Sequence, residues 1–89
     1  MAASQPSPLK YPCSFPIKVF GKVEDAFESF VVAIVRKHVP ELPEENVTSR
    51  MSAGGRYLAV TATFIAYSRE QLDALYTELS THDRILMVL

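Results

Sequence analysis

The feature that most constrains the fold of this chain is the order in which two hydrophobic periodicities follow one another. Apolar residues alternate over 15–21, recur at helical spacing over 24–38, and alternate again over 47–52 and 57–67. A second helical stripe then leads to a short apolar segment, 84–89. A period of two is typical of a strand, whereas spacings of three and four residues are typical of an amphipathic helix. The chain therefore predicts the element order β-α-β-β-α-β.

Polar residues mark the ends of both predicted helices. Asp25 followed by Glu28 forms a capping pair for the first helix. Its C-terminal end is marked by the basic residues Arg36, Lys37 and His38, which complement the helix dipole, and by Pro40, which prevents continuation. Ser68 followed by Gln71 is the S-x-x-Q capping box of the second helix.

The apolar stripes of the two helices predict the core. The first stripe consists of Phe27, Phe30, Val31, Ile34 and Val35, and the second of Leu72, Leu75, Tyr76 and Leu79. Phe30 lies in the middle of its stripe, so we expect it to be a central core residue. Its truncation to Ala should then cost about 3–5 kcal/mol of stability.

The strands carry their own punctuation. Gly54 and Gly55 supply the positive φ angles of a tight hairpin between 47–52, which is polar enough to be an edge strand, and 57–67. Pro16 is expected near the beginning of the first strand, where its missing N–H need not belong to the ladder.

The β-α-β-β-α-β order is that of the α+β, ferredoxin-like fold: a four-stranded antiparallel sheet of order 4-1-3-2 with two helices on one face. With 89 residues the chain has room for one such domain, which we place at 11–89. Residues 1–10 hold two prolines among polar residues, and we expect them to form a flexible arm.

Composition excludes several classes of function. Nine Lys and Arg against ten Asp and Glu give a net charge of −1, so phosphate-driven nucleic-acid binding has no obvious source. No apolar stretch is long enough to span a membrane, and residues 1–12 lack the apolar core of a signal peptide, so we expect a cytoplasmic protein.

The residue types that carry chemistry are sparse. Cys13 is the only cysteine, and with His38 and His82 alone it cannot assemble an ordinary zinc site, so neither a metal nor a cofactor is expected. Cys13 also lacks an activating basic neighbour, and His38 is explained by the end of a helix. We therefore expect no catalytic residue.

Several short motifs lie in register over 11–89. They are Tyr11-Pro12-x-x-Phe15-x-x-Lys18-Val19-x-Gly21, Ser52-x-x-Gly55-x-Tyr57, Leu75-Tyr76-x-Glu78-Leu79 and Met87-Val88-Leu89. Together they resemble the YbeD-like family of small bacterial proteins. The resemblance implies a ferredoxin-like fold akin to the ACT-type regulatory domains of amino-acid metabolism, a cytosolic bacterial setting and no catalytic residue. Members of the family are sometimes labelled as lipoate-related regulators.

The helix-free face of the predicted sheet is the candidate interaction surface. Phe20, Tyr57, Ile65 and Met87 would be exposed on it if the protein were alone. Such a patch indicates a protein partner or a homodimer, although single apolar residues occur on every protein surface. An RNA-binding mode is the weaker interpretation, since only Phe20 and Tyr57 could stack on bases.

The end of the first strand is the candidate small-molecule site. Gly21 would allow an effector to approach the backbone, as in ACT-type domains, with Lys22 beside it and Lys18 able to meet a carboxylate. The alternative is that Gly21 merely permits the turn that follows. We therefore expect a non-enzymatic regulatory or adaptor protein that acts through protein contacts of its sheet face. The alternative is a sensor of an amino acid or of a lipoyl- or octanoyl-type acid.

Overall fold

The structure, a computed structural model, describes residues 10–24 and 26–89. Its elements are β1 (Cys13–Lys22), α1 (Phe27–His38), a short 3₁₀ helix η1 (Glu44–Asn46), β2 (Val47–Met51), β3 (Tyr57–Ala66), α2 (Arg69–Ser80) and β4 (Ile85–Val88). The predicted order of strands and helices is confirmed. The arm predicted for 1–10 lies, apart from Lys10, outside the described residues.

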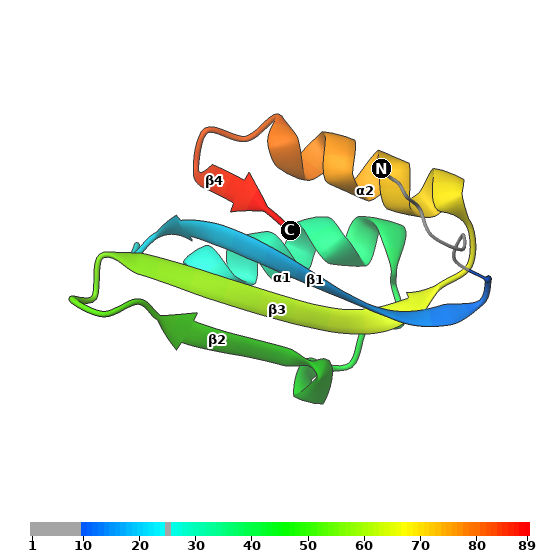
Figure 1. The fold of residues 1–89 in the computed structure, drawn as a ribbon, viewed down its shortest axis with the longest axis horizontal. Coiled ribbons are helices and arrows are strands. Elements are labelled where there is room, and N and C mark those ends of the chain that lie inside the picture. Colours follow the sequence, from blue (N-terminus) through cyan, green and yellow to red (C-terminus); the bar gives the residue numbers. More distant parts are fainter. Residues whose placement is uncertain (1–9, 25) are drawn as a thin grey trace, which may run out of the picture.

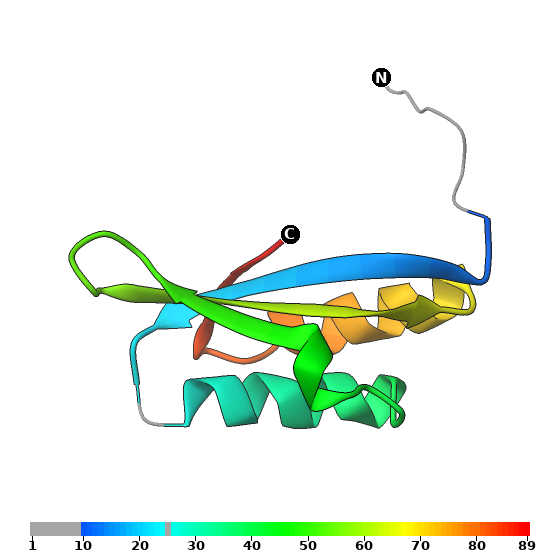
Figure 2. The same cartoon turned by 90° about the horizontal axis from the view of Figure 1, so that it is seen from below.

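The four strands form one antiparallel sheet in the order β2-β3-β1-β4, as predicted (Figure 1). β1 and β3 pair along their whole lengths and form its centre. Both helices lie on the same side of this sheet (Figure 2). The opposite side is called the open face below, because no described helix covers it.

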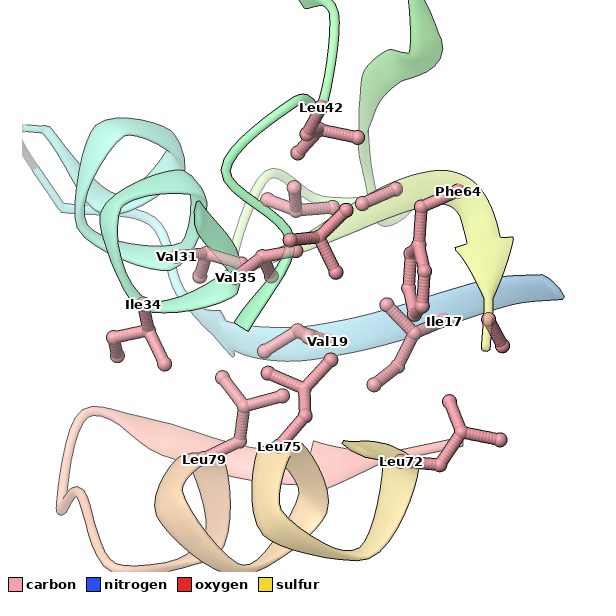
Figure 3. Packing of buried hydrophobic residues seen from close by; sticks show 14 of the residues in the cluster. Ile17, Val19, Val31, Ile34, Val35, Leu42, Phe64, Leu72, Leu75 and Leu79 are labelled. Atoms are coloured by element: carbon pink, nitrogen blue, oxygen red, sulfur yellow. The ribbon is translucent and has the colours of Figure 1, made fainter. Parts of the chain in front are cut away.

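The core fills the space between the sheet and the two helices (Figure 3). Alternate residues of β1 and β3, such as Ile17, Val19 and Val60, are fully buried because a period of two directs them toward the helices. Leu75 and Leu79 of α2 meet them from the other side, as the helical spacing predicts.

Phe30 is not the central core residue that its place in the helical stripe suggested. It is half-buried at the border of the core, whereas Phe27 is 1% exposed. The reason is the rotation of α1 about its axis, which directs Phe27 at the sheet and leaves Phe30 beside Arg84 and His82.

The Ser68 cap of α2 is present as predicted, whereas the Gln71 side chain bonds the residue before the N-cap. The Ser68 hydroxyl accepts a hydrogen bond from the Gln71 backbone N–H at 3.1 Å, and the Gln71 side chain accepts one from the Tyr67 N–H at 2.7 Å. For α1, the expected cap Asp25 lies outside the described residues. The N-cap position is held by Ala26, which has a φ of 63° and makes no side-chain cap hydrogen bond.

Pro16 lies in a central strand, at a point where its missing N–H interrupts no pairing. The N–H and C=O of Lys18 bond Leu89 at 3.1 and 2.8 Å. Residues two apart in a strand direct their backbone groups toward the same neighbouring strand, so the backbone of Pro16, like that of Lys18, is directed toward the β4 side of β1. Among the described strands, β4 pairs with β1 only over 19–21, so none of them needs a donor at Pro16.

The β2–β3 hairpin turns at the two glycines, as predicted. Gly54 and Gly55 have φ angles of 88° and 68°, which residues other than glycine rarely adopt. β2 is the polar edge strand that its sequence indicated. No helix in the described part of the chain is both long and apolar enough to cross a membrane.

Candidate functional site

Two rows of side chains run across all four strands on the open face. Residues that pair directly across antiparallel strands project from the same face, so the register defines each row. The first row is Arg50, Ala59, Phe20 and Met87, and the second row is Thr48, Thr61, Lys18 and Leu89, which directly follows β4 and bonds Lys18 through its backbone. The rows are neighbours, because their members are two residues apart on each strand. The polar part of the rows, on β2 and β3 and at Lys18 of β1, thus adjoins an apolar half made of Phe20, Met87 and Leu89.

A hollow of about 530 Å³ lies at the middle of these rows. Small side chains of β3, Ala59 and Thr61, form its floor, and longer side chains, Lys18, Phe20 and Arg50, surround it. Lys18 and Arg50 are exposed and belong to strands on either side of β3. In the part of the chain that the structure describes, neither cation has an ion-pair partner.

Of the four residues predicted for the interaction surface, three lie near one another. Phe20 and Met87 are direct cross-strand partners, and Tyr57 is the diagonal neighbour of Phe20 on β3. Ile65 also projects from the open face, but it lies six residues farther along β3 than Ala59. That separation is about 20 Å, so Ile65 is not part of the same surface.

The three residues predicted for a small-molecule site do not form one cluster. Lys18 and Lys22 project from the open face, whereas Gly21, which alternates with them, faces the helices and is buried. The space beside the Gly21 α-carbon is filled by the Phe27 ring and the backbone oxygen of Arg84. Gly21 therefore belongs to the strand and to its packing against α1, and the described turn begins after it.

Sequence reasoning gave no site role to several members of the rows, among them Arg50 and Leu89. Arg50 was assigned to a strand but to no site, and Leu89 was treated only as the end of an apolar segment. The hairpin glycines contain the signal for Arg50, because the turn fixes its pairing with Ala59. Nothing local pairs Leu89 with Lys18, because that pairing depends on how a strand distant in sequence docks beside β1.

The strongest electrostatic cluster lies away from the open face, between the two helices. Glu78 of α2 accepts hydrogen bonds from Lys37 Nζ at 2.6 Å and meets His38 Nε2 at 2.8 Å. The hydrogen bond from Lys37 and the contact with His38 lower the pKa of the Glu78 carboxyl below its ordinary value. The Gln71 side chain also donates to the His38 carbonyl, so these groups join α1 to α2.

The remaining groups that could carry chemistry are scattered. Cys13 is half-buried, as expected for a structural thiol. His82 packs edge-on against Phe30, with ring centroids 5.1 Å apart. Burial raises the pKa of the Tyr76 hydroxyl. No three His, Cys, Asp or Glu residues of the described ranges 10–24 and 26–89 converge as metal ligands would.

Comparison with known proteins places the chain in a family. A family model described as "Protein of unknown function (DUF493)" matches residues 6–89. The chain belongs to the DUF493 family. This membership confirms the resemblance to the YbeD-like family of small bacterial proteins. The family description names no catalytic activity.

Curated UPF0250 relatives are similar to this chain over most of their length. A UPF0250 protein of Chromobacterium violaceum is 43% identical over 81 residues, which cover 91% of each chain. A UPF0250 protein of Nitrosomonas europaea is 40% identical over 97% of this chain and 99% of its own. A third, from Ralstonia nicotianae, is 45% identical over 91% of this chain and 84% of its own.

Solved structures support the ferredoxin-like fold. The solution structure of protein HP0495 from Helicobacter pylori superposes with a TM-score of 0.71, covering all of this chain and 93% of that protein. A second solution structure of HP0495 gives a TM-score of 0.52. The sequence identities are 12% and 13%, so these likenesses concern the fold alone.

Proposed function

We propose that this member of the DUF493 family is a non-enzymatic regulatory or adaptor protein of the bacterial cytoplasm. It acts by binding another protein through the open face of its sheet. The supporting observation is the apolar half of the two rows: Met87 and Leu89 are 49% and 60% exposed beside Phe20. Clustered apolar side chains on a face that no described helix covers favour a docking surface.

The distribution of reactive groups also supports a binding role. The described titratable cluster of Lys37, His38 and Glu78 joins the two helices and lies outside the hollow. The residues that line the hollow include two cations and three hydroxyl side chains, which suit anions, but no carboxylate, thiol or imidazole for acid–base or nucleophilic chemistry. The resemblance to the YbeD-like family, which implies a fold akin to ACT-type regulatory domains, agrees with a regulatory role for the protein.

The experiment is affinity capture from a lysate of the source bacterium with wild-type protein and two matched variants. Met87→Glu places a charge on the open face, and Met51→Glu makes the same change at a methionine that pairs with Leu58 on the other side. Both methionines are exposed, at 49% and 58%. We expect Met87→Glu to lose a protein that the wild type and Met51→Glu retain.

Light scattering of the three purified proteins tests self-association in the same experiment. A dimer that Met87→Glu dissociates would make a second copy of this chain the partner. Equal capture by both variants, with all three proteins monomeric, would contradict the proposal.

A second candidate function is a small-molecule sensor, and the hollow is the observation that favours it. Lys18 and Arg50 beside Phe20 suit a carboxylate attached to an apolar body, such as an amino acid or a lipoyl- or octanoyl-type acid. A thermal-shift panel of these compounds tests this function. Stabilisation that Lys18→Glu removes would support a sensor, because a ligand stabilises only the state to which it binds.

A further inference from the structure

Positive charge is segregated on the open face. None of the ten acidic residues of the chain falls in any of the four strands, whereas Lys18, Lys22 and Arg50 do. All three project from the open face because they share its register. A chain of net charge −1 thus presents a cationic surface on one side.

Described carboxylates near the strands lie away from the hollow, and two of them, Glu24 and Asp83, line a separate pocket beside Lys22. Glu28 of α1 accepts a hydrogen bond from Ser49 at 2.6 Å, and Ser49 alternates with the open-face residues of β2. Glu24 is held by Arg84 at 3.1 Å. Acidic groups from a partner would therefore meet no described carboxylate of this chain at the hollow.

The spacing of the two cations indicates what kind of group fits. Lys18 and Arg50 belong to strands separated by β3 and lie in adjacent rows, so their α-carbons are about 12 Å apart on the sheet. Their side chains border a floor made of Ala59 and Thr61, so two anionic groups could be received over it. Carboxylates on one face of a peptide segment lie about 6–7 Å apart, which is within reach of both flexible cations.

The apolar half of the rows limits the ligand further. Phe20, Met87 and Leu89 adjoin the cations on one side only, so a matching segment has acidic residues beside apolar residues. A nucleic acid fits less well, because its affinity depends on several cations along a phosphate backbone and on stacked aromatics. Here two cations and one aromatic ring border the hollow.

We propose that the open face binds an acidic, amphipathic segment of a partner protein. Its carboxylates lie over Lys18 and Arg50, and its apolar side chains lie over Phe20 and Met87. This inference rests on the proposed function, because it names the chemistry of the partner at the same surface.

The test is NMR chemical-shift mapping of the isotope-labelled protein with two defined peptides. The probe is an end-blocked Glu-Leu-Glu-Leu-Glu-Leu peptide, and its control is Lys-Leu-Lys-Leu-Lys-Leu. We expect the acidic peptide to shift the amide signals of the two rows at up to millimolar concentration, and the basic peptide to leave them in place. Added salt should weaken the binding, because exposed charges are screened.

Matched charge reversals locate the binding energy. The double variant Lys18→Glu/Arg50→Glu should weaken binding of the acidic peptide by about tenfold or more, because the two new carboxylates repel those of the peptide. Lys37→Glu/Arg69→Glu makes the same charge change on the two helices and should leave its affinity near that of the wild type. Amide spectra of both variants establish that they are folded.

Several outcomes would overturn the inference. These are absence of shifts, shifts confined to the helices, equal binding of both peptides, or no effect of Lys18→Glu/Arg50→Glu. Tighter binding at the same rows by oligouridine RNA, phosphatidylglycerol vesicles, free glutamate or octanoate would replace the acidic segment with another ligand class. In each case capture of a partner that Met87→Glu abolishes would still support the proposed function, so the two failures are distinguishable.

Discussion

The ring of Phe27 lies against the α-carbon of Gly21, in the space where a β-carbon would stand. On the same side, the backbone oxygen of Arg84 is 2.7 Å from that position. A glycine in β1 thus allows α1 and the segment before β4 to approach the sheet closely. This contact makes Gly21 a structural residue, whatever binds elsewhere.

Gly21→Ala should destabilise the protein by about 1–3 kcal/mol, because neither a ring in the core nor a backbone oxygen yields without strain. Urea unfolding of the variant measures this cost. In a Phe27→Leu background the substitution should cost less, because the smaller side chain leaves room. An equal cost in both backgrounds would show that the ring is not what the new methyl group meets.

The two phenylalanines of α1 should differ in their contributions to stability. Phe27→Ala removes a buried ring and should cost about 3–5 kcal/mol. Phe30→Ala should cost roughly half as much, because its half-exposed ring transfers less surface from water. Denaturant titration of both variants checks the order, and a larger loss for Phe30→Ala would contradict the orientation of α1.

This pair shows where sequence reasoning ends. The helical spacing predicts both phenylalanines on one stripe, but it does not fix the rotation of the helix over the sheet. That rotation depends on Gly21, which belongs to another element. The element order and the glycine hairpin were predictable from local periodicity and turn chemistry, and the sheet order from the fold that this element order specifies.

The residues of the open face likewise fall into those that the sequence predicts and those that depend on strand pairing. The exposure of Phe20, Tyr57 and Met87 follows from alternation along each strand and was predictable. The position of Leu89 beside Lys18 depends on the docking of a segment distant in sequence. Arg50 and Ile65 were predictable, because the glycine turn fixes the pairing of Arg50 with Ala59, and Ile65 lies far from Tyr57 on the same strand. The hollow requires the register of β1 against β3, which no local pattern contains.

The Ser68 cap should contribute measurably to α2. Ser68→Ala removes the acceptor for the Gln71 N–H and should cost about 1 kcal/mol. Ser80→Ala is the matched control, because Ser80 is exposed at the other end of the same helix. Thermal unfolding compares the two variants, and equal melting temperatures would show that the cap adds nothing.

The contacts of Glu78 with Lys37 and His38 should make the free energy of unfolding depend on pH in the acid range. Interactions with Lys37 and His38 lower the pKa of Glu78, so they favour the ionised, folded form. Their contribution is fully present above the ordinary pKa of 4.5 and is lost as the pH falls through the lower pKa of the folded state.

Glu78→Gln should therefore reduce the loss of stability below about pH 4.5. Glu70→Gln is the control, since Glu70 is exposed in the first turn of the same helix. Urea titrations across the acid range give the slope for each protein. A slope that Glu78→Gln leaves unchanged would mean that this carboxylate does not couple folding to pH.

The most direct test of the open face as a binding surface is photo-crosslinking in living cells of the source bacterium. A photoreactive amino acid is placed at Thr48, which borders the hollow, or at Met51, an exposed residue of β2 that pairs with Leu58 on the other face and does not line the hollow. We expect a discrete crosslinked product from position 48 and little or none from position 51. Equal products from both positions, or a product from position 51 alone, would contradict binding through the open face.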